Sequence, residues 1–221
     1  MNRKNRSVGL ILMLVGILLF IGAAALTVYN VYDSNRASEA ADEVMSELLL
    51  AVGTKKDKDA ETTSQLMNEV YIPDDKKEEA PEYVVYPEKS LPTVEIKGQR
   101  YIGYIEFPDL GLILPVAGEE WSYEALDKTP CLYSGSVYTD DAIIAGHNYT
   151  AHFGPLSRLS KGSEVIFTDV EGNVFRYELS WTETINENDS DAMHAGDDWD
   201  LTLFTCNYTG NRRYTLRCVR V

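Results

Sequence analysis

Hydrophobic and polar residues are distributed differently in three parts of this chain, and the first part is a long apolar run. Residues Val8 to Val28 contain no charged side chain. As an α-helix this run extends roughly 31 Å, at about 1.5 Å per residue, which matches the apolar core of a bilayer. A cleaved signal peptide is the alternative, but its apolar region would be about 7–15 residues long and followed by a small-residue cleavage site. The pattern therefore predicts a retained transmembrane helix over residues 8–28.

The charges on either side of this run indicate its orientation. Three basic residues lie in the tail 1–7, whereas the side beyond Tyr29 begins with acidic residues such as Asp33 and Glu39. Segments rich in Lys and Arg stay in the cytoplasm. We therefore expect a cytoplasmic basic tail at residues 1–7 and a single-pass protein of the cell membrane whose remaining chain is extracellular.

The second part, residues 29–92, is polar and divides into two segments. Residues 34–52 are rich in helix formers, and their apolar positions Val44, Leu48 and Ala51 recur at helical spacing. Residues 53–92 are dense in mixed charge and poor in large apolar side chains, so they cannot bury enough surface to offset chain entropy. The pattern predicts a juxtamembrane helix followed by a charged flexible linker.

The third part, residues 93–221, alternates short apolar runs with turn formers, which is typical of β-strands. Helical patterns are short and lie near Glu120–Lys128 and Gly154–Leu159. Seven or eight strands in one segment of this length favour a closed or nearly closed β-barrel. The predicted strands are YIGYIEF, LILPV, AIIAG, EVIFTD, VFRYELSW, LTLFTC and RYTLRCVRV.

Charge and cysteine content narrow the possible functions. The 221-residue chain has a net charge of −15 and a pI near 4.6. This field repels phosphate-rich partners, so no nucleic-acid binding is expected. The three cysteines, Cys131, Cys206 and Cys218, match neither a paired disulfide framework nor a zinc-ligand spacing. At least one thiol is therefore unpaired or reactive.

Two residues with catalytic chemistry lie where predicted strands end. His147 follows the apolar run Ala142–Gly146, and Cys206 closes the alternating run Leu201–Thr205. A side chain at a strand end can face a groove while its neighbours anchor it. Taken singly, either residue also fits a structural role, since a free cysteine often behaves as a small buried hydrophobe.

An arginine completes the candidate group. A four-residue hairpin loop from Tyr208 to Asn211 would pair Cys206 with Arg213 across two strands, with facing Cβ atoms about 4.5–5.5 Å apart. Arg212 would then point away from the thiol, and Arg217 would lie roughly 13 Å along the strand. Arg213 is the predicted partner.

These three residue types together suit acyl transfer through a thioester. A thiolate is the nucleophile, an imidazole exchanges protons near neutral pH, and a guanidinium offers donors to the oxyanion of a tetrahedral intermediate. An arginine that merely pairs with surface carboxylates is the structural alternative.

The motifs in this order resemble those of the sortases, the membrane-anchored cysteine transpeptidases of Gram-positive bacteria. Leu201–Cys206 is similar to the family's TLxTC signature, and Arg213 follows on the next strand. Ala145–Asn148 resembles the segment with the catalytic histidine, and Ile102–Val116 resembles the opening strands. The resemblance implies a mainly β fold, the eight-stranded sortase β-barrel with short helices, with His147 as general acid/base, Cys206 as nucleophile and Arg213 as the oxyanion or substrate stabiliser.

By the same resemblance, the enzyme cleaves a C-terminal, LPxTG-like sorting motif of surface proteins and transfers the acyl group to an amine of the cell envelope, with peptidoglycan as the expected acceptor. A hydrolytic cysteine protease on the same barrel, or an anchored binding module with an inert Cys206, are the alternatives. The class stays open, because the His-Asn pair and the short Cys-to-Arg spacing are class B-like, whereas the short His147-to-Cys206 separation leaves no room for the class B helical insertion.

The remaining histidines and acidic residues receive weaker predictions. His152 and His194 match no catalytic position and are expected in loops. No cofactor is expected, although some class A sortases bind calcium near the corresponding acidic loop, and carboxylates suit a hard cation. The acidic residues of this loop are Glu187, Asp189, Asp191, Asp197, Asp198 and Asp200.

Overall fold

The computed structural model describes residues 3–67, 89–118, 122–194, 198–207 and 210–221. The chain divides into two compact units, Met1–Arg36 and Ala37–Val221. Parts of the predicted linker (residues 68–88), Asp197 and Tyr208 lie outside the described residues.

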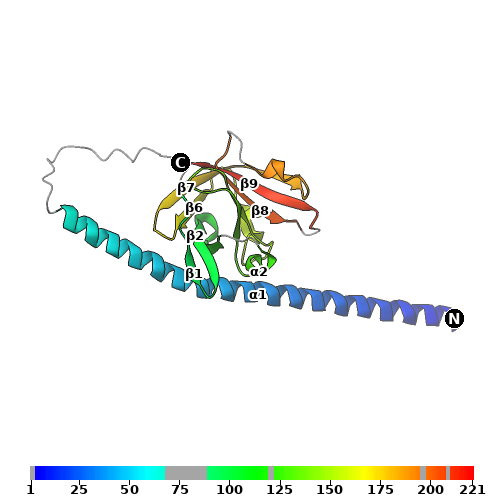
Figure 1. The fold of residues 1–221 in the computed structure, drawn as a ribbon. Coiled ribbons are helices and arrows are strands. Elements are labelled where there is room, and N and C mark those ends of the chain that lie inside the picture. Colours follow the sequence, from blue (N-terminus) through cyan, green and yellow to red (C-terminus); the bar gives the residue numbers. More distant parts are fainter. Residues whose placement is uncertain (1–2, 68–88, 119–121, 195–197, 208–209) are drawn as a thin grey trace. The chain divides into compact units, whose positions relative to one another are not determined.

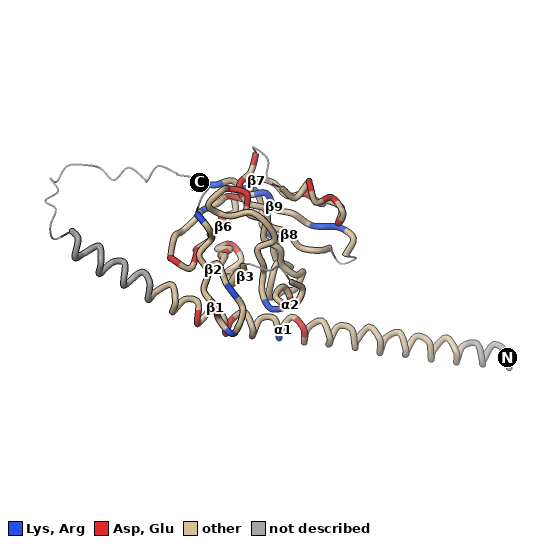
Figure 2. Tube along the Cα trace, viewed as in Figure 1, with Lys and Arg blue, Asp and Glu red and all other residues tan. Residues whose placement is uncertain are grey.

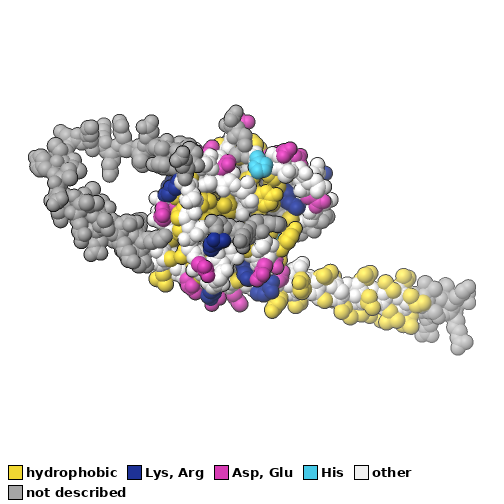
Figure 3. All heavy atoms as spheres, viewed as in Figure 1, with side chains coloured by type: hydrophobic (Ala, Val, Ile, Leu, Met, Phe, Trp, Pro, Cys, Tyr) yellow, Lys and Arg dark blue, Asp and Glu magenta, His cyan; other side chains and the backbone are white. Residues whose placement is uncertain are grey.

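The first unit consists of the beginning of helix α1 (Arg3–Met67). Within α1, Gly9–Gly53 contains a window apolar enough to cross a membrane, with a mean hydropathy of 2.8 and no burial. Residues 9–32 of α1 carry no charged side chain, as the tan start of the helix in Figure 2 shows, and Figure 3 shows hydrophobic side chains covering its surface. A long exposed apolar helix is the feature expected of a membrane anchor.

The second unit begins with the part of α1 that the sequence predicts as a juxtamembrane helix. Four apolar residues of this part recur at three- and four-residue steps, and their side chains are buried inside the second unit: Ala37, Ala41, Val44 and Leu48. Lys97, in the barrel part of this unit, forms ion pairs with Glu43 and Glu47 of the helix. The helix therefore belongs to the same compact unit as the barrel, whereas a domain starting at residue 93 was expected.

Helix α1 also continues beyond the predicted end at residue 52, through Met67. The sequence of residues 53–67 is too polar to be buried, but it contains no proline and many helix formers, including Ala, Glu, Lys and Gln. The polar composition of residues 53–67 therefore indicated only that this segment does not pack into a core. It did not exclude a helix.

In the described residues, nine strands form one sheet (Figure 1) in the order β1-β2-β3-β4-β5-β8-β9-β7-β6. Because β2 pairs with β6 as well as with β3, the eight strands from β2 to β9 close into a barrel, and β1 pairs with the start of β2. This confirms the predicted eight-stranded barrel. The strands are β1 (Val94–Ile96), β2 (Gln99–Phe107), β3 (Leu112–Ala117), β4 (Cys131–Ser134), β5 (Ala142–Ala145), β6 (Glu164–Asp169), β7 (Val174–Asn186), β8 (Leu201–Cys206) and β9 (Arg212–Arg220).

The barrel closes where β2 approaches β6 very closely. Gly103 pairs with Asp169, and a Cβ atom at this glycine would lie 2.0 Å from the carbonyl oxygen of Thr168. The glycine also has a φ of 152°, which side chains disfavour. A larger residue at position 103 would push the two closing strands apart.

Short helical segments connect the strands. They are η1 (Pro108–Leu110), α2 (Tyr123–Leu126), η2 (Gly154–Arg158) and η3 (Asp191–Met193). The α2 and η2 segments occupy the two regions where the sequence predicts short helices. Strands β1 and β4 were missed because each is only three or four residues long.

The side chains of the barrel pack on both faces of the sheet. One cluster includes Ile105, Phe107, Phe153, Leu203 and Leu216, with the Phe107 and Phe153 rings packed edge to face at 5.8 Å. A second cluster lies on the other face of the same strands and brings together residues of the helix, α2, β5 and β8, among them Leu48, Leu126, Ile143 and Phe204. The candidate site lies at one end of these strands, and both faces of the strands pack against a hydrophobic cluster.

Candidate active site

The pairing of β5 with β8 brings two candidate residues side by side. The strands are parallel, and Ala145 pairs with Phe204. The ladder continues to the Gly146 N–H, which donates to the Phe204 carbonyl at 3.0 Å. Two residues beyond this pair lie His147, in the loop that follows β5, and Cys206, at the end of β8. Both side chains are partly exposed.

The pairing of β8 with β9 adds Arg213 to this pair. Cys206 is paired with Arg213, and the next N–H, of Asn207, donates to the Arg212 carbonyl at 3.0 Å. Directly opposed residues of antiparallel strands project from the same face. The register predicted from the sequence is therefore confirmed. Cys206 and Arg213 lie on adjacent strands, and His147 follows β5, the strand on the other side of β8.

The guanidinium of Arg213 is held by the hairpin that follows Cys206. Its Nη1 donates to the Gly210 carbonyl at 3.0 Å. A guanidinium has five N–H donors in a planar fork, so this bond leaves donors for a second partner. Arg212 is exposed, as predicted.

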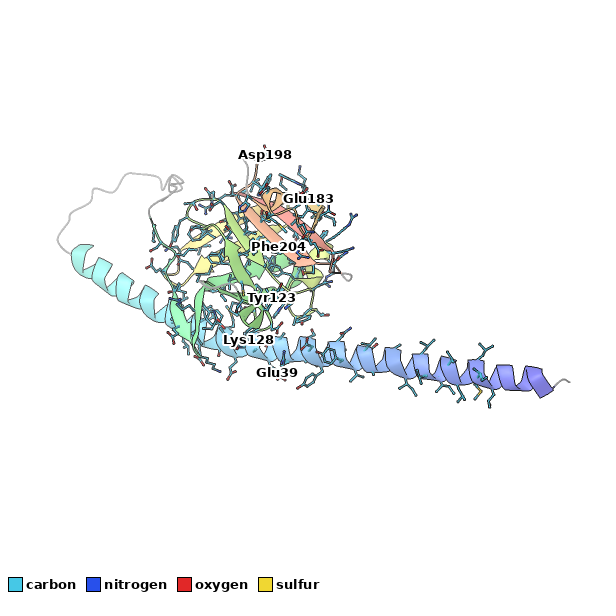
Figure 4. All side chains as sticks on the ribbon, turned by 45° about the vertical axis from the view of Figure 1, so that its right-hand side comes forward. Glu39, Tyr123, Lys128, Glu183, Asp198 and Phe204 are labelled. Carbon is cyan, nitrogen blue, oxygen red and sulfur yellow. The ribbon has the colours of Figure 1, made fainter. Side chains whose placement is uncertain are left out.

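A second row of side chains lies beside the first on the same face of the sheet. Arg213 is paired with Ile185 of β7. Two residues further along β9, Thr215 is opposite Glu183 of β7 on one side and Phe204 of β8 on the other. Phe204 is opposite Ala145. Figure 4 labels Glu183 and Phe204 of this row. The three candidate residues therefore lie beside a row that is buried and mostly apolar, except for the partly exposed carboxylate of Glu183.

The three cysteines occupy different environments, and all three are free thiols. Burial raises the pKa of both Cys131 and Cys218 to about 12. Both are therefore protonated at neutral pH and shielded from reagents. Cys206 differs from them because it is partly exposed at a strand end.

His147 has two contacts that fix its ring. Its Nε2 lies 2.9 Å from Oδ1 of Asp127. The ring of Tyr149 stacks on the imidazole with a centroid separation of 4.7 Å and an interplanar angle of 25°. The sequence analysis did not identify Asp127, because an acidic residue after a short helix has no distinguishing local pattern.

His152 lies in a turn, as expected, but its side chain is fully buried. Its ring packs against Tyr149 at 5.7 Å, and among the described residues neither ring nitrogen has a hydrogen-bond partner. Burial, together with the nearby charge of His147, lowers the pKa of His152 to about 4. It is therefore a neutral core residue, whereas His194 is exposed, as expected.

Arg217 is buried, with only 1% of its side chain exposed. Its Nε donates to Glu183 at 2.8 Å, and its Nη1 donates to the Met193 carbonyl at 3.0 Å and to Thr202 Oγ1 at 2.7 Å. The guanidinium also lies over the Trp199 ring at 4.4 Å. The sequence placed Arg217 on the face away from the core, but the segment that connects β7 to β8 covers this face.

The acidic loop, for which no cofactor was expected, lies in this connecting segment. Among the described residues, no group of three or more His, Cys, Asp or Glu side chains is arranged to hold a metal ion. Asp189 accepts from the Ala192 N–H at 3.2 Å, and Asp200 accepts from the Arg220 N–H at 2.7 Å. These two carboxylates therefore stabilise backbone.

Comparison with known proteins supplies the family. A model of the sortase domain matches residues 105–221, which is more than half of the chain. Sortase A of Listeria monocytogenes is 33% identical over 67 residues, covering 29% of this chain and 30% of that protein. The alignment thus spans less than a third of this curated relative.

Solved structures of two sortases share the fold. Sortase A from Corynebacterium diphtheriae has a TM-score of 0.50 and 20% identity, covering 56% of this chain and 61% of the other. Sortase C-1 from Streptococcus pneumoniae has a TM-score of 0.50 and 22% identity, covering 57% and 69%. At these identities the likeness concerns the fold alone. Given the domain match over most of the barrel, this chain belongs to the sortase family.

Proposed function

We propose that this sortase is a cysteine transpeptidase that is anchored in the cell membrane by residues 8–28 and acts outside the cell. It cleaves an LPxTG-like sorting signal at the C-terminus of surface proteins and joins the new carboxyl end to an amine of the cell envelope. The observation that carries the proposal is the row formed by His147, two residues after β5, Cys206 of β8 and Arg213 of β9.

The first half of the reaction is the formation of a thioester. The Cys206 thiolate attacks the carbonyl carbon of the scissile peptide bond, and Arg213 donates to the oxyanion of the tetrahedral intermediate. When the C–N bond breaks, His147 gives its proton to the departing amine. The products are an acyl group on Cys206 and the released C-terminal peptide.

The second half returns the enzyme to its starting state. An acceptor amine, which we expect to belong to peptidoglycan, attacks the thioester carbonyl while His147 takes a proton from the amine. The C–S bond breaks, Cys206 leaves as a thiolate, and a new amide bond has formed. No external oxidant, reductant or metal is needed for this balance.

The surface beside the catalytic row suits an apolar peptide. Phe204 and Ile185 are nearly buried on the same face, and the exposed Tyr133 ring packs edge to face on Phe204 at 5.5 Å. Apolar side chains of a sorting signal such as Leu and Pro gain contact area on such a surface.

The full-length chain in detergent, incubated with a sorting peptide, tests this function. We expect an acyl adduct on Cys206 in the mass spectrum of the quenched protein, and an amide product when an amine such as triglycine is added. The matched control is Cys218→Ala, which removes a buried thiol and should still form the adduct.

Two outcomes would support the alternatives. Cleavage that yields only the free acid at every amine concentration would make this protein a hydrolase. Peptide binding without any adduct on Cys206 would make it a binding module. Either result would contradict the proposed transpeptidase.

A further inference from the structure

The structure shows a carboxylate on the candidate acid/base that the proposed mechanism does not use. Asp127 lies 20 residues before His147 in the sequence, and its Oδ1 is 2.9 Å from His147 Nε2. An ionised carboxylate can only accept hydrogen bonds, so this contact requires a hydrogen on Nε2. In the neutral ring the lone pair is then on Nδ1.

Asp127 is itself held firmly by the segment that carries it. Ser122 caps the short helix α2 by accepting from the Ala125 N–H at 3.1 Å, and the Asp127 N–H donates to the Tyr123 carbonyl at 2.9 Å. Ala125 and Leu126, which precede Asp127, are buried in the core cluster that also contains Phe204. Figure 4 marks this segment by Tyr123 and Lys128.

The residues that follow Asp127 fix the other end of the segment. The Thr129 hydroxyl donates to the Pro115 carbonyl, and the Ala117 N–H donates to the Pro130 carbonyl at 2.9 Å. The neighbouring cation, Lys128, pairs with Glu124 at 3.2 Å, one turn away. Asp127 is therefore presented to His147 by a braced segment.

Tyr149 fixes the imidazole in a second direction. Its ring covers one face of His147, while Asp127 lies at the ring edge. A face contact limits tilting of the ring, and an edge contact limits its rotation. With Nε2 occupied, Nδ1 is the ring nitrogen left to exchange protons with a neighbour such as Cys206.

We propose that Asp127 is a positioning residue for catalysis, whose carboxylate keeps the proton of His147 on Nε2 so that Nδ1 serves Cys206 and the departing amine. The proposal rests on the proposed function for its catalytic consequence, but the proton position on His147 is independent of it. An incidental surface ion pair is the competing explanation, since 49% of the Asp127 side chain is exposed and such pairs contribute little to stability.

The test compares Asp127→Ala, Asp127→Asn and Asp127→Glu with the parent, all as full-length chains in detergent. Glu124→Ala is the matched control. It also removes a carboxylate from this segment, but the Glu124 carboxylate pairs with Lys128 and not with His147. Histidine labelled with ¹⁵N reports which ring nitrogen carries the proton. The chain has only three histidines, so the His147 signals can be assigned by single substitutions.

We expect Asp127→Ala to lower kcat about 10–100-fold with little change in KM, because a misplaced catalytic group costs up to about 10²-fold. A second tautomer with the proton on Nδ1 should appear in this variant and in Asp127→Asn. The thermal midpoint should stay within about 2 °C. Asp127→Glu should restore most of the rate, and Glu124→Ala should match the parent in every measurement.

Three results would overturn the proposal. They are an unchanged tautomer in Asp127→Ala, a rate within twofold of the parent, and an equal loss in Glu124→Ala. A parent enzyme that forms no adduct would instead refute the proposed function, and the ¹⁵N measurement would still decide whether Asp127 orients His147.

Discussion

Strands β8 and β9 carry a cysteine and an arginine near each end of their shared ladder, and the two ends differ in every other respect. At one end Cys206 is opposite Arg213, and both side chains are partly exposed. Toward the other end Arg217 and Cys218 are buried, the first in a network of hydrogen bonds and the second in the barrel core. The residue types are the same, so the surroundings decide which pair is free to react.

The covering segment explains the difference. The described part of the connection from β7 to β8 supplies the Ala192 and Met193 carbonyls and the Trp199 ring to Arg217. Buried polar groups must be hydrogen-bonded, and this arginine satisfies several carbonyl and hydroxyl oxygens at once. Such a residue stabilises the fold, and its burial keeps it from a substrate.

The largest expected effect is on activity at the open end. Cys206→Ala should lower the rate of acyl transfer by about 10⁴-fold or more, because the covalent step is lost, while the thermal midpoint stays near that of the parent. Cys218→Ala should show the opposite pattern, with a lower midpoint from the cavity left in the core and retained adduct formation. Retained turnover in Cys206→Ala, with Cys131 or Cys218 labelled instead, would reverse the comparison.

The next effect is on stability at the covered end. Arg217→Ala should lower the free energy of unfolding by about 3–5 kcal/mol, because it removes a buried guanidinium together with its ion pair to Glu183 and its hydrogen bonds to the Met193 carbonyl and the Thr202 hydroxyl. Urea denaturation of the full chain measures this change. Arg212→Ala is the control, since it is exposed and should change stability by less than about 0.5 kcal/mol. Equal values for the two variants would refute the role assigned to the network.

Arg217 also shows what the sequence could and could not predict. Alternation along β9 correctly put Leu216 and Cys218 in the core and correctly paired Cys206 with Arg213. Periodicity assigns a face to each residue, but it does not report what covers the opposite face. The sequence analysis only placed Arg217 too far along the strand to reach the thiol; the structure shows that its side chain holds a buried hydrogen-bond network together, so Arg217→Lys should destabilise the fold.

The barrel and the row of three candidate residues followed from local patterns, whereas the supporting contacts did not. Strand-end positions of His147 and Cys206 are visible in short apolar runs, and the hairpin signals identify Arg213. Asp127 and the helix residues Val44 and Leu48 act through contacts that join segments distant in sequence. A single sequence carries no pattern that specifies such contacts.

A third effect separates the two arginines nearest the thiol. Arg213→Lys keeps the charge but loses the planar fork of donors, so acylation should fall by about 10²-fold, as when one oxyanion donor is removed. Arg212→Lys should stay within a few-fold of the parent. Single-turnover acylation on a sorting peptide measures both variants. A larger loss in Arg212→Lys would remove Arg213 from the proposed mechanism.

The smallest expected effect extends the comparison to the two neighbouring histidines, of which His147 is partly exposed and His152 is buried. The pKa of His152 is lowered to about 4 in the folded protein, below the usual value of 6.5. Between pH 6.5 and 4 the unfolded state therefore binds a proton that the folded state does not, so this residue makes stability fall as the pH falls, by up to about 1.4 kcal/mol per pH unit.

Asp140 acts in the opposite sense, because burial raises its pKa to about 6 and favours the folded state as it becomes protonated. The effect of His152 on the free energy of unfolding must therefore be measured as the difference between two proteins that both contain Asp140. The difference in unfolding free energy between His152→Leu and the parent should change by about 1.4 kcal/mol per pH unit across this window, with the variant gaining relative stability in acid. His194→Gln, which replaces an exposed histidine, should keep the parent's pH dependence. If the unfolding free energies of His152→Leu and the parent changed with pH in parallel, His152 would be hydrated or protonated in the folded state. It would then not be a buried, neutral histidine.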